Sequence, residues 1–273
     1  MSEFSSASFA AKTNVAVLCL SGGMDSTSLL LHLLAEETEV YSISLDYGQK
    51  HKIELERLQL NLKYLADHGY KVPHHVLNLS GLGALYHSAL TNDDWEVPTG
   101  FYAQDNMKQT VVPNRNAIFA SIAYGYALSI ASRLQKKTKL ALGVHSGDHA
   151  IYPDCRPAFY HAIMQAFSIG NWDSENVELS LPYIDGDKVS ILRDAEQSCL
   201  KLDLDFDTVF RNTWTSYQPD ELGRADGRTG SDVERILAFD AIGRIDPVEY
   251  RDAWKEVLSY AKLAELKFHS KLD

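Results

Sequence analysis

The sequence predicts an α/β protein with a doubly wound, mainly parallel sheet, followed by a mainly helical C-terminal part. Three observations predict this class. Short apolar runs alternate with helical patterns along residues 14–186, each run ends in a polar or glycine-containing loop, and residues 187–273 carry mainly helical patterns. With 273 residues, of which 45% are hydrophobic, the chain is long enough to bury such a core. We expect residues 1–13 to form a flexible arm.

The apolar run at residues 15–20 has no helical period, which predicts a buried parallel strand, and a helix is expected from Ser26 to Leu34. A second strand at 40–45 and a charged helix from 51 to about 68 repeat this unit. Further strands are expected at 74–79 and 139–144, separated by a long loop at 81–112 and a helix at 114–134. After a helix at 188–200, helices are predicted at 232–242 and 247–267.

Residues 21–27, which read SGGMDST, follow the first predicted strand directly. Two adjacent glycines let the backbone come close to a ligand, and the free N–H groups at the start of the next helix favour an anion. The lysine of the better-known nucleotide loop, G-x-x-x-x-G-K-[ST], is absent here. The segment therefore predicts a phosphate-binding turn of another kind.

The formal net charge of −11 opposes binding to a polyanion, so nucleic acid is disfavoured and a small-molecule substrate is favoured. The three cysteines, Cys19, Cys155 and Cys199, form no C-x-x-C pair, and residues 1–12 have no signal-peptide pattern. No apolar stretch approaches the ~20 residues needed to cross a bilayer. These features favour a cytoplasmic protein without a membrane segment.

Ligands of parallel sheets bind beyond the carboxyl ends of the strands, where Ser21, Asp46, Ser80 and His145 are expected. Cys155 could be a nucleophile or a packed thiol, since no base is defined beside it. The spacing of the histidines at 145, 149 and 161 matches no zinc signature.

The SGGxDS hexapeptide resembles the signature of the PP-loop ATP pyrophosphatases, which have a Rossmann-like fold. Further segments, in sequence order, resemble the QueC family, from about residue 14 to residue 250: LSGGMDS at 20–26, DYGQKH at 46–51, SALT at 88–91, VPNRN at 112–116, YPDCRP at 152–157 and TW at 213–214. The resemblance implies a PP-loop ATP-binding domain at residues 14–186.

The resemblance also implies a ligase that uses Mg-ATP to adenylylate the carboxylate of 7-carboxy-7-deazaguanine. Ammonia then gives the amide, and a second activation gives 7-cyano-7-deazaguanine (preQ0), a queuosine precursor. ATP is expected at Ser21, Gly22, Gly23, Asp25, Ser26 and Thr27, with Mg²⁺ at Asp25. The expected catalytic residues are Asp25, Ser26, Lys188 and Arg115, the last two stabilising charge on the departing group. The expected substrate-binding residues are Tyr47, Gln49, Asp154, Arg156 and Trp214.

The chain departs from the family at the structural zinc site, which four cysteines form in QueC proteins. The aligned positions in the loop 213–232 are Ser216, Asp226, Thr229 and Asp232, so no thiolate remains and we expect no zinc. One explanation is that hydrogen bonds, together with Asp226 or Asp232 paired to Arg224, Arg228 or Arg235, now hold the loop. The other is a specialised paralogue of bacterial antiviral defence that stops at the amide or conjugates the deazaguanine to an amine of a partner protein.

Two other classes stay open on the sequence. A tRNA-thiolating PP-loop enzyme needs a cysteine pair and a basic surface, which this chain lacks. A non-catalytic binding module could retain the fold without turning ATP over. The C-terminal extension, residues 251–273, has apolar residues at helical spacing, which indicates either a homodimer or partner surface or a face docked on this chain.

Overall fold

The computed structural model describes residues 14–49, 53–92, 94–101, 105–217 and 219–270. The predicted arm at 1–13 and the last three residues of the extension lie outside the described residues, as do Lys50 and His51 of the DYGQKH segment. The described strands form one parallel sheet in the order β3-β2-β1-β4-β5. Their bounds are β1 Val15–Cys19, β2 Glu39–Asp46, β3 His74–Asn78, β4 Thr138–Ala141 and β5 Val177–Ser180.

Strand β1 lies at the centre of the sheet, where Val15 pairs with Glu39 of β2 on one side and with Thr138 of β4 on the other. The chain winds outward through β2 and β3, crosses back over β1, and winds through β4 and β5 in the opposite direction. This reversal confirms the predicted double winding, and it places the switch point between β1 and β4, where such sheets bind ligands. Strand β5 was not predicted, because its four residues, VELS, give too short a pattern at the sheet edge.

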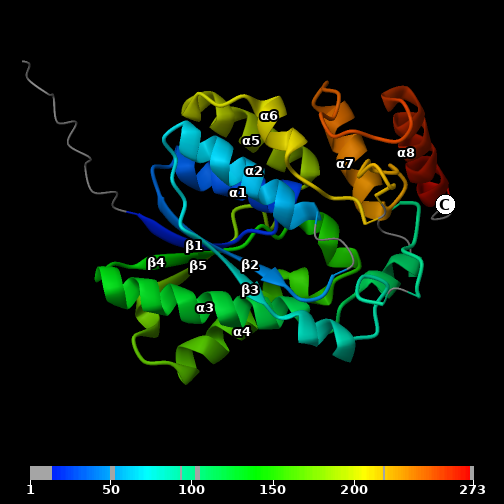
Figure 1. Ribbon diagram of the computed structural model, residues 1–273. Coiled ribbons are helices and arrows are strands. Elements are labelled where there is room, and N and C mark those ends of the chain that lie inside the picture. The colour runs from blue at the N-terminus through cyan, green and yellow to red at the C-terminus, as the bar shows by residue number, and fades with distance from the viewer. Residues whose placement is uncertain (1–13, 50–52, 93, 102–104, 218, 271–273) are drawn as a thin grey trace, which may run out of the picture.

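Helices cover both faces of the sheet (Figure 1). The face with the N-terminal helices carries α1 Met24–Ala35, α2 Ile53–Asp67, α5 Lys188–Leu202 and the unpredicted α6 Phe206–Arg211, and the other carries α3 Arg115–Leu134 and α4 Pro157–Gly170. Helices α7 Gly230–Ala241 and α8 Trp254–His269 pack against each other through an apolar cluster that includes Val233 and Val257. Helix α1 begins two residues before the predicted start, and α8 begins at Trp254 rather than at residue 247.

Helix α3 corrects the expectation that no stretch approaches the length needed to cross a bilayer. Among the described residues it is the one helix whose 20 residues are long and apolar enough by length and composition alone. It packs against β1 and β4 with Ala120, Ala123 and Ala127 buried in the core beneath the sheet. Its apolar composition therefore follows from its place in the core, where small side chains bring the helix close to the strands.

The long loop predicted at residues 81–112 contains two short 3-10 helices, Ser80–Leu85 and Asp105–Thr110. It meets the C-terminal part at Gly100, whose N–H donates to the carbonyl of Arg228, and Thr99 forms a bridge with Thr229. Leu90 of this loop reaches the cavity described below. The loop thus connects the sheet domain to the segment 213–232.

Candidate active site

The turn after β1 requires glycine at position 22. Gly22 has a φ of +93°, and a Cβ atom there would lie 2.4 Å from the backbone oxygen of Glu54 at the start of α2. The carbonyl of Gly22 accepts a 3.0 Å hydrogen bond from the backbone N–H of Trp214. The turn is therefore held closely between α2 and the segment that follows α6.

Serine hydroxyls fix the shape of this turn from inside. The hydroxyls of Ser21 and Ser26 lie 3.1 Å apart, and each also accepts a backbone N–H, from Gly23 and Ser21 respectively. Gly23 is the N-cap of α1, so Asp25 and Ser26 belong to the first helical turn. The positive end of the α1 dipole and its free N–H groups therefore lie beside the turn, which is the arrangement that binds phosphate.

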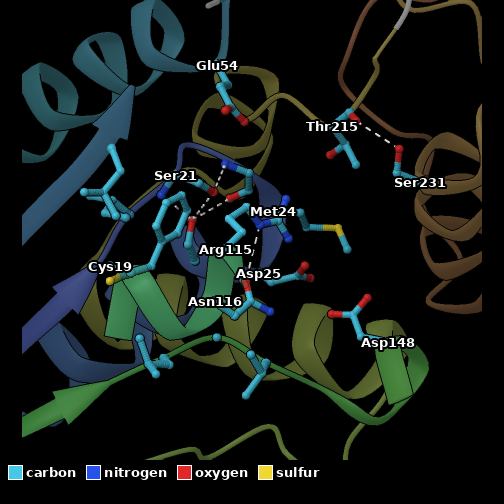
Figure 2. Close-up of a pocket in the computed structure, with 18 of the residues that line it drawn as sticks. Cys19, Ser21, Met24, Asp25, Glu54, Arg115, Asn116, Asp148, Thr215 and Ser231 are labelled. Atoms are coloured by element: carbon cyan, nitrogen blue, oxygen red, sulfur yellow. Dashed lines mark hydrogen bonds between the residues drawn. The ribbon is translucent and has the colours of Figure 1, made fainter. Parts of the chain in front are cut away.

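A cavity of about 290 Å³ opens at the carboxyl ends of β1, β2 and β4 (Figure 2). It collects side chains from segments that lie far apart in the sequence. The predicted site residues that line it are Ser21, Gly23, Asp25, Ser26, Tyr47, Gln49, Arg115, Lys188 and Trp214.

Four predicted site residues do not line this cavity. Gly22 packs against α2 and is not part of the cavity lining, and Thr27 is fully buried behind the turn. The short 3-10 turn Pro153–Cys155 buries the side chain of Cys155, whereas Asp154 is only half-buried. Arg156 is exposed, and its Nε donates to the carbonyl of His149.

Lys188 and Asp25 form the main charge contact of the site, with Nζ 2.6 Å from Oδ2 and side chains that are 13% and 24% exposed. Burial works to raise the pKa of Asp25, but the charge of Lys188 and the hydrogen bond that it donates act against burial, and this pKa is lowered overall. Burial works to lower the pKa of Lys188, but the carboxylates of Asp25, Glu234 and Asp148 raise it overall. Both groups are therefore charged at neutral pH.

His145 closes this charged group on the side of β4. Its Nε2 lies 3.5 Å from Asp148 and 3.8 Å from Asp25, while its Nδ1 accepts the N–H of Gly147. Burial, and then the charge of Lys188, lower the pKa of His145, so the imidazole is neutral. Burial raises the pKa of Glu234 to about 8, against the opposing effect of Lys188. The net charge of this cluster of side chains around Lys188 and Asp25 thus depends on whether Glu234 is protonated.

The second oxygen of Asp25 fits the metal that accompanies ATP. Its Oδ1 is buried and has no hydrogen-bond partner among the described residues. Mg²⁺ is commonly held by one or two carboxylates, with phosphates and water completing its shell. Within the described part of the chain, no group of three or more acidic, histidine or cysteine side chains forms a metal cage. Asp25 therefore fits Mg²⁺ that is shared with a nucleotide.

Several aromatic rings form one wall of the cavity, which we call the aromatic wall. Arg115 lies with its guanidinium carbon 6.0 Å from the ring centres of both Tyr47 and Tyr152, and Phe119 and Tyr217 line the cavity as well. Aromatic walls that carry a few polar groups are typical of sites for planar ligands.

Glu54 enters the cavity from the first turn of α2 (Figure 2). Burial raises the pKa of Glu54 to about 7, although a 3.3 Å hydrogen bond from the Gln49 amide opposes this rise. Its carboxyl group can therefore change its protonation state near neutral pH.

Residues 15–243 match the family described as Queuosine biosynthesis protein QueC. The chain belongs to the QueC family. It is 45% identical over 235 residues to the 7-cyano-7-deazaguanine synthase of Caldicellulosiruptor saccharolyticus, covering 86% of this chain and 95% of that protein. It is 43% identical over 235 residues to the enzyme of the same name from Methanoregula boonei, covering 86% and 98%. A solved 4-thiouridine synthetase in complex with RNA and ATP aligns with 93% of this chain and 53% of its own, at a TM-score of 0.44 and 16% identity.

In this QueC-family chain, the four positions aligned with the zinc cysteines come together in space. Asp232 Oδ2 accepts hydrogen bonds from the hydroxyls of Ser216, at 3.0 Å, and Thr229, at 2.7 Å. Burial raises the pKa of Asp232 to about 7, and the neighbouring carboxyl of Asp226 adds to this effect. We call Ser216, Asp226, Thr229 and Asp232 the polar cluster. It joins the start of α7 to a segment that lines the cavity.

The arginine pairing expected for this loop is wrong, because each arginine has another partner. Arg224 pairs with Asp220, Arg228 with Asp252, and the buried Arg235 with Asp246. These carboxylates lie outside the polar cluster, so neither Asp226 nor Asp232 forms an ion pair with any of the three arginines. The other expectation, that hydrogen bonds hold the loop, agrees with these contacts.

Several cavity residues were missed because no local motif points to them. Glu54, Tyr217 and Glu234 lie on separate elements that meet only in the folded chain. Tyr152 lies inside the YPDCRP segment and lines the cavity, whereas the predicted residues of that segment, Asp154 and Arg156, do not.

Proposed function

We propose that this protein is a 7-cyano-7-deazaguanine synthase that uses ATP, 7-carboxy-7-deazaguanine and ammonia. The observation that carries the proposal is one cavity that joins a phosphate-binding turn to an aromatic wall. The names of the relatives described above give the product, 7-cyano-7-deazaguanine. The cavity offers groups suited both to the phosphates of ATP and to a flat heterocycle. The three cysteines are free thiols, which fits a reducing cytoplasm.

In the first step, a carboxylate oxygen of the substrate attacks the α-phosphorus of ATP, and the bond to the bridging oxygen of pyrophosphate breaks. Ser21, Ser26, the two glycines and the start of α1 hold the phosphates, with Thr27 supporting the helix behind them. Lys188 stabilises the charge that develops on pyrophosphate. Asp25 would hold Mg²⁺, which shields the phosphate charges when bound.

Ammonia then attacks the acyl carbon, AMP leaves, and loss of a proton gives the amide. In the second step, the amide oxygen attacks a second ATP with loss of pyrophosphate. Release of AMP and of the two protons on nitrogen from the activated amide gives the nitrile. Both activation steps release pyrophosphate from ATP. We therefore assign Lys188 and the turn after β1 to both steps.

The heterocycle is placed against the aromatic wall, where Tyr47, Gln49 and Trp214 contribute. Packing of planar rings against these side chains excludes water from the acyl-adenylate, which otherwise hydrolyses. Asp154 and Arg156 lie outside the cavity lining, and we leave them out of the proposed substrate site.

A second candidate is a specialised enzyme that transfers the activated acyl group to an amine of a partner protein or stops at the amide. Two observations favour considering it. The polar cluster borders the cavity through Ser216, and α8 extends beyond the family match, which ends at residue 243. The acceptor side of the site could therefore differ while the activation step stays the same.

Pyrophosphate exchange into ATP tests the activation step. We expect exchange that requires 7-carboxy-7-deazaguanine and is lost in Asp25→Asn, because that variant loses the carboxylate that pairs with Lys188. Absence of substrate-dependent exchange in the wild type would contradict the proposal and favour a non-catalytic module.

A further inference from the structure

Arg115 is a half-buried cation that forms no ion pair with a carboxylate of the described residues. Its Nε donates to the amide oxygen of Asn116 at 3.3 Å, and one terminal nitrogen donates to the hydroxyl of Tyr47 at 3.5 Å. Within the described part of the chain, no carboxylate lies within 4.0 Å of its guanidinium. Arginine stays protonated in proteins, so this positive charge persists inside the cavity.

Arg235, which is fully buried, shows how a structural guanidinium is held in this protein. Arg235 makes two hydrogen bonds to Asp246, at 2.6 and 2.9 Å, and three more to Thr213, Thr215 and the carbonyl of Phe210. Removing a charge from water without such partners is costly. The contrast indicates that the fork of Arg115 is left open for an anion that enters the cavity.

Two anions meet in the proposed reaction, the pyrophosphate of ATP and the carboxylate of the substrate. Pyrophosphate already has the turn after β1, the start of α1 and Lys188. Arg115 instead lies among aromatic side chains, within 6.0 Å of two tyrosine rings. Its planar fork matches the two oxygens of a carboxylate, and the rings suit the flat heterocycle that carries it.

We infer that Arg115 binds the carboxylate of a planar heteroaromatic acid before activation, and that it does not act on the departing pyrophosphate. This inference rests on the proposed function and replaces the role that the sequence suggested for Arg115. It has a specific consequence, because the substrate is an anion in the first activation and a neutral amide in the second. Arg115 therefore favours the acid over the amide, whereas Lys188 serves both.

The test measures kcat/KM separately for 7-carboxy-7-deazaguanine and for its amide, at saturating ATP, in Arg115→Gln. We expect a loss of about 100-fold for the acid and of less than about tenfold for the amide, since only the acid loses a charge-assisted pair. The KM for ATP should change by less than about threefold. Lys188→Met is the comparison variant, and it should reduce both activities by similar factors. Equal losses for acid and amide in Arg115→Gln, or a large rise in the KM for ATP, would overturn the inference.

Binding measurements keep the inference separate from the proposed function. Calorimetric titration without ATP should show tight binding of the acid to the wild type and weak binding to Arg115→Gln, with the amide bound similarly by both. Arg115→Lys keeps the charge but loses the fork, so we expect an intermediate affinity and a fold that matches the wild type by circular dichroism. Undiminished acid binding in Arg115→Gln contradicts the inference alone. A wild type that binds neither acid nor amide contradicts the proposed function as well as the inference.

Discussion

Lys188 at the start of α5 places its ammonium 2.6 Å from the carboxylate of Asp25 in the first turn of α1. The two residues are 163 positions apart, and their helices pack side by side on one face of the sheet. The contact brings the only cation of α5's first turn to the phosphate-binding turn. It also leaves the second oxygen of Asp25, Oδ1, without a hydrogen-bond partner among the described residues, and we propose that this oxygen binds the metal that accompanies ATP.

Replacing Lys188 with methionine should lower kcat for pyrophosphate exchange by about 100- to 1000-fold, because a preorganised positive charge at the leaving group is lost. Methionine retains the unbranched apolar stem, so the packing of α5 against α1 changes little. Lys201→Met, at the exposed far end of the same helix, should stay within about twofold of the wild type. Equal activities of the two variants would remove Lys188 from the proposed mechanism.

Gly22 and Gly69 provide a matched pair, since both have a φ of +93°. Gly69 has no atom within 4 Å of an added Cβ, whereas Gly22 has the backbone oxygen of Glu54 at 2.4 Å. We expect Gly69→Ala to cost about 1 kcal/mol of unfolding free energy through its backbone conformation alone. Gly22→Ala should cost on the order of 2 kcal/mol more, because a backbone atom must move. Urea denaturation measures the unfolding free energy of each variant. Similar losses in the two variants would show that the backbone of α2 moves away from position 22 at little cost.

Much of the fold could be predicted from the sequence, because each long element has a strong local pattern. The turn after β1 was predictable because its glycines, serines and aspartate are contiguous between a strand and a helix. Glu54, Tyr217 and Glu234 could not be predicted, since each reaches the cavity through tertiary packing of a different element. Strand β5 and helix α6 were missed because four and six residues carry too little periodicity to recognise.

The polar cluster should make the protein less stable as pH rises. The folded-state pKa of Asp232, about 7, is above its unfolded value, so the folded chain holds a proton that the unfolded chain releases. Stability is then fully present below pH 4 on this account and is lost as pH rises toward 7. Glu54 and Glu234, with raised pKa values of about 7 and 8, act in the same direction.

Asp232→Asn separates the cluster from these other groups. The amide oxygen can still accept from Ser216 and Thr229, and the amide nitrogen can replace the proton next to Asp226. Relative to the wild type, we expect the variant to gain unfolding free energy as pH increases from 5 to 8. Parallel pH profiles from denaturant titrations would show that Asp232 is ionised throughout this range.

The cluster also predicts that a metal site can be restored. A variant with Ser216→Cys, Asp226→Cys, Thr229→Cys and Asp232→Cys should bind one zinc per chain, because the four side chains converge in a buried volume. Elemental analysis, with Co²⁺ absorption as a check on thiolate ligation, measures this. We expect the wild type to purify without stoichiometric zinc. One zinc bound to the wild type would contradict that expectation, and a zinc-free variant would contradict the proposed convergence.

The central claim is that a phosphate-binding turn and an aromatic wall in one cavity convert a deazaguanine carboxylate to a nitrile. Its most direct test is mass spectrometry of the small-molecule products after incubation with ATP, 7-carboxy-7-deazaguanine and ¹⁵N-ammonia. The account predicts 7-cyano-7-deazaguanine that carries one ¹⁵N, with two AMP and two pyrophosphate released for each nitrile. An amide that accumulates without nitrile, or no product that requires ATP, would contradict it.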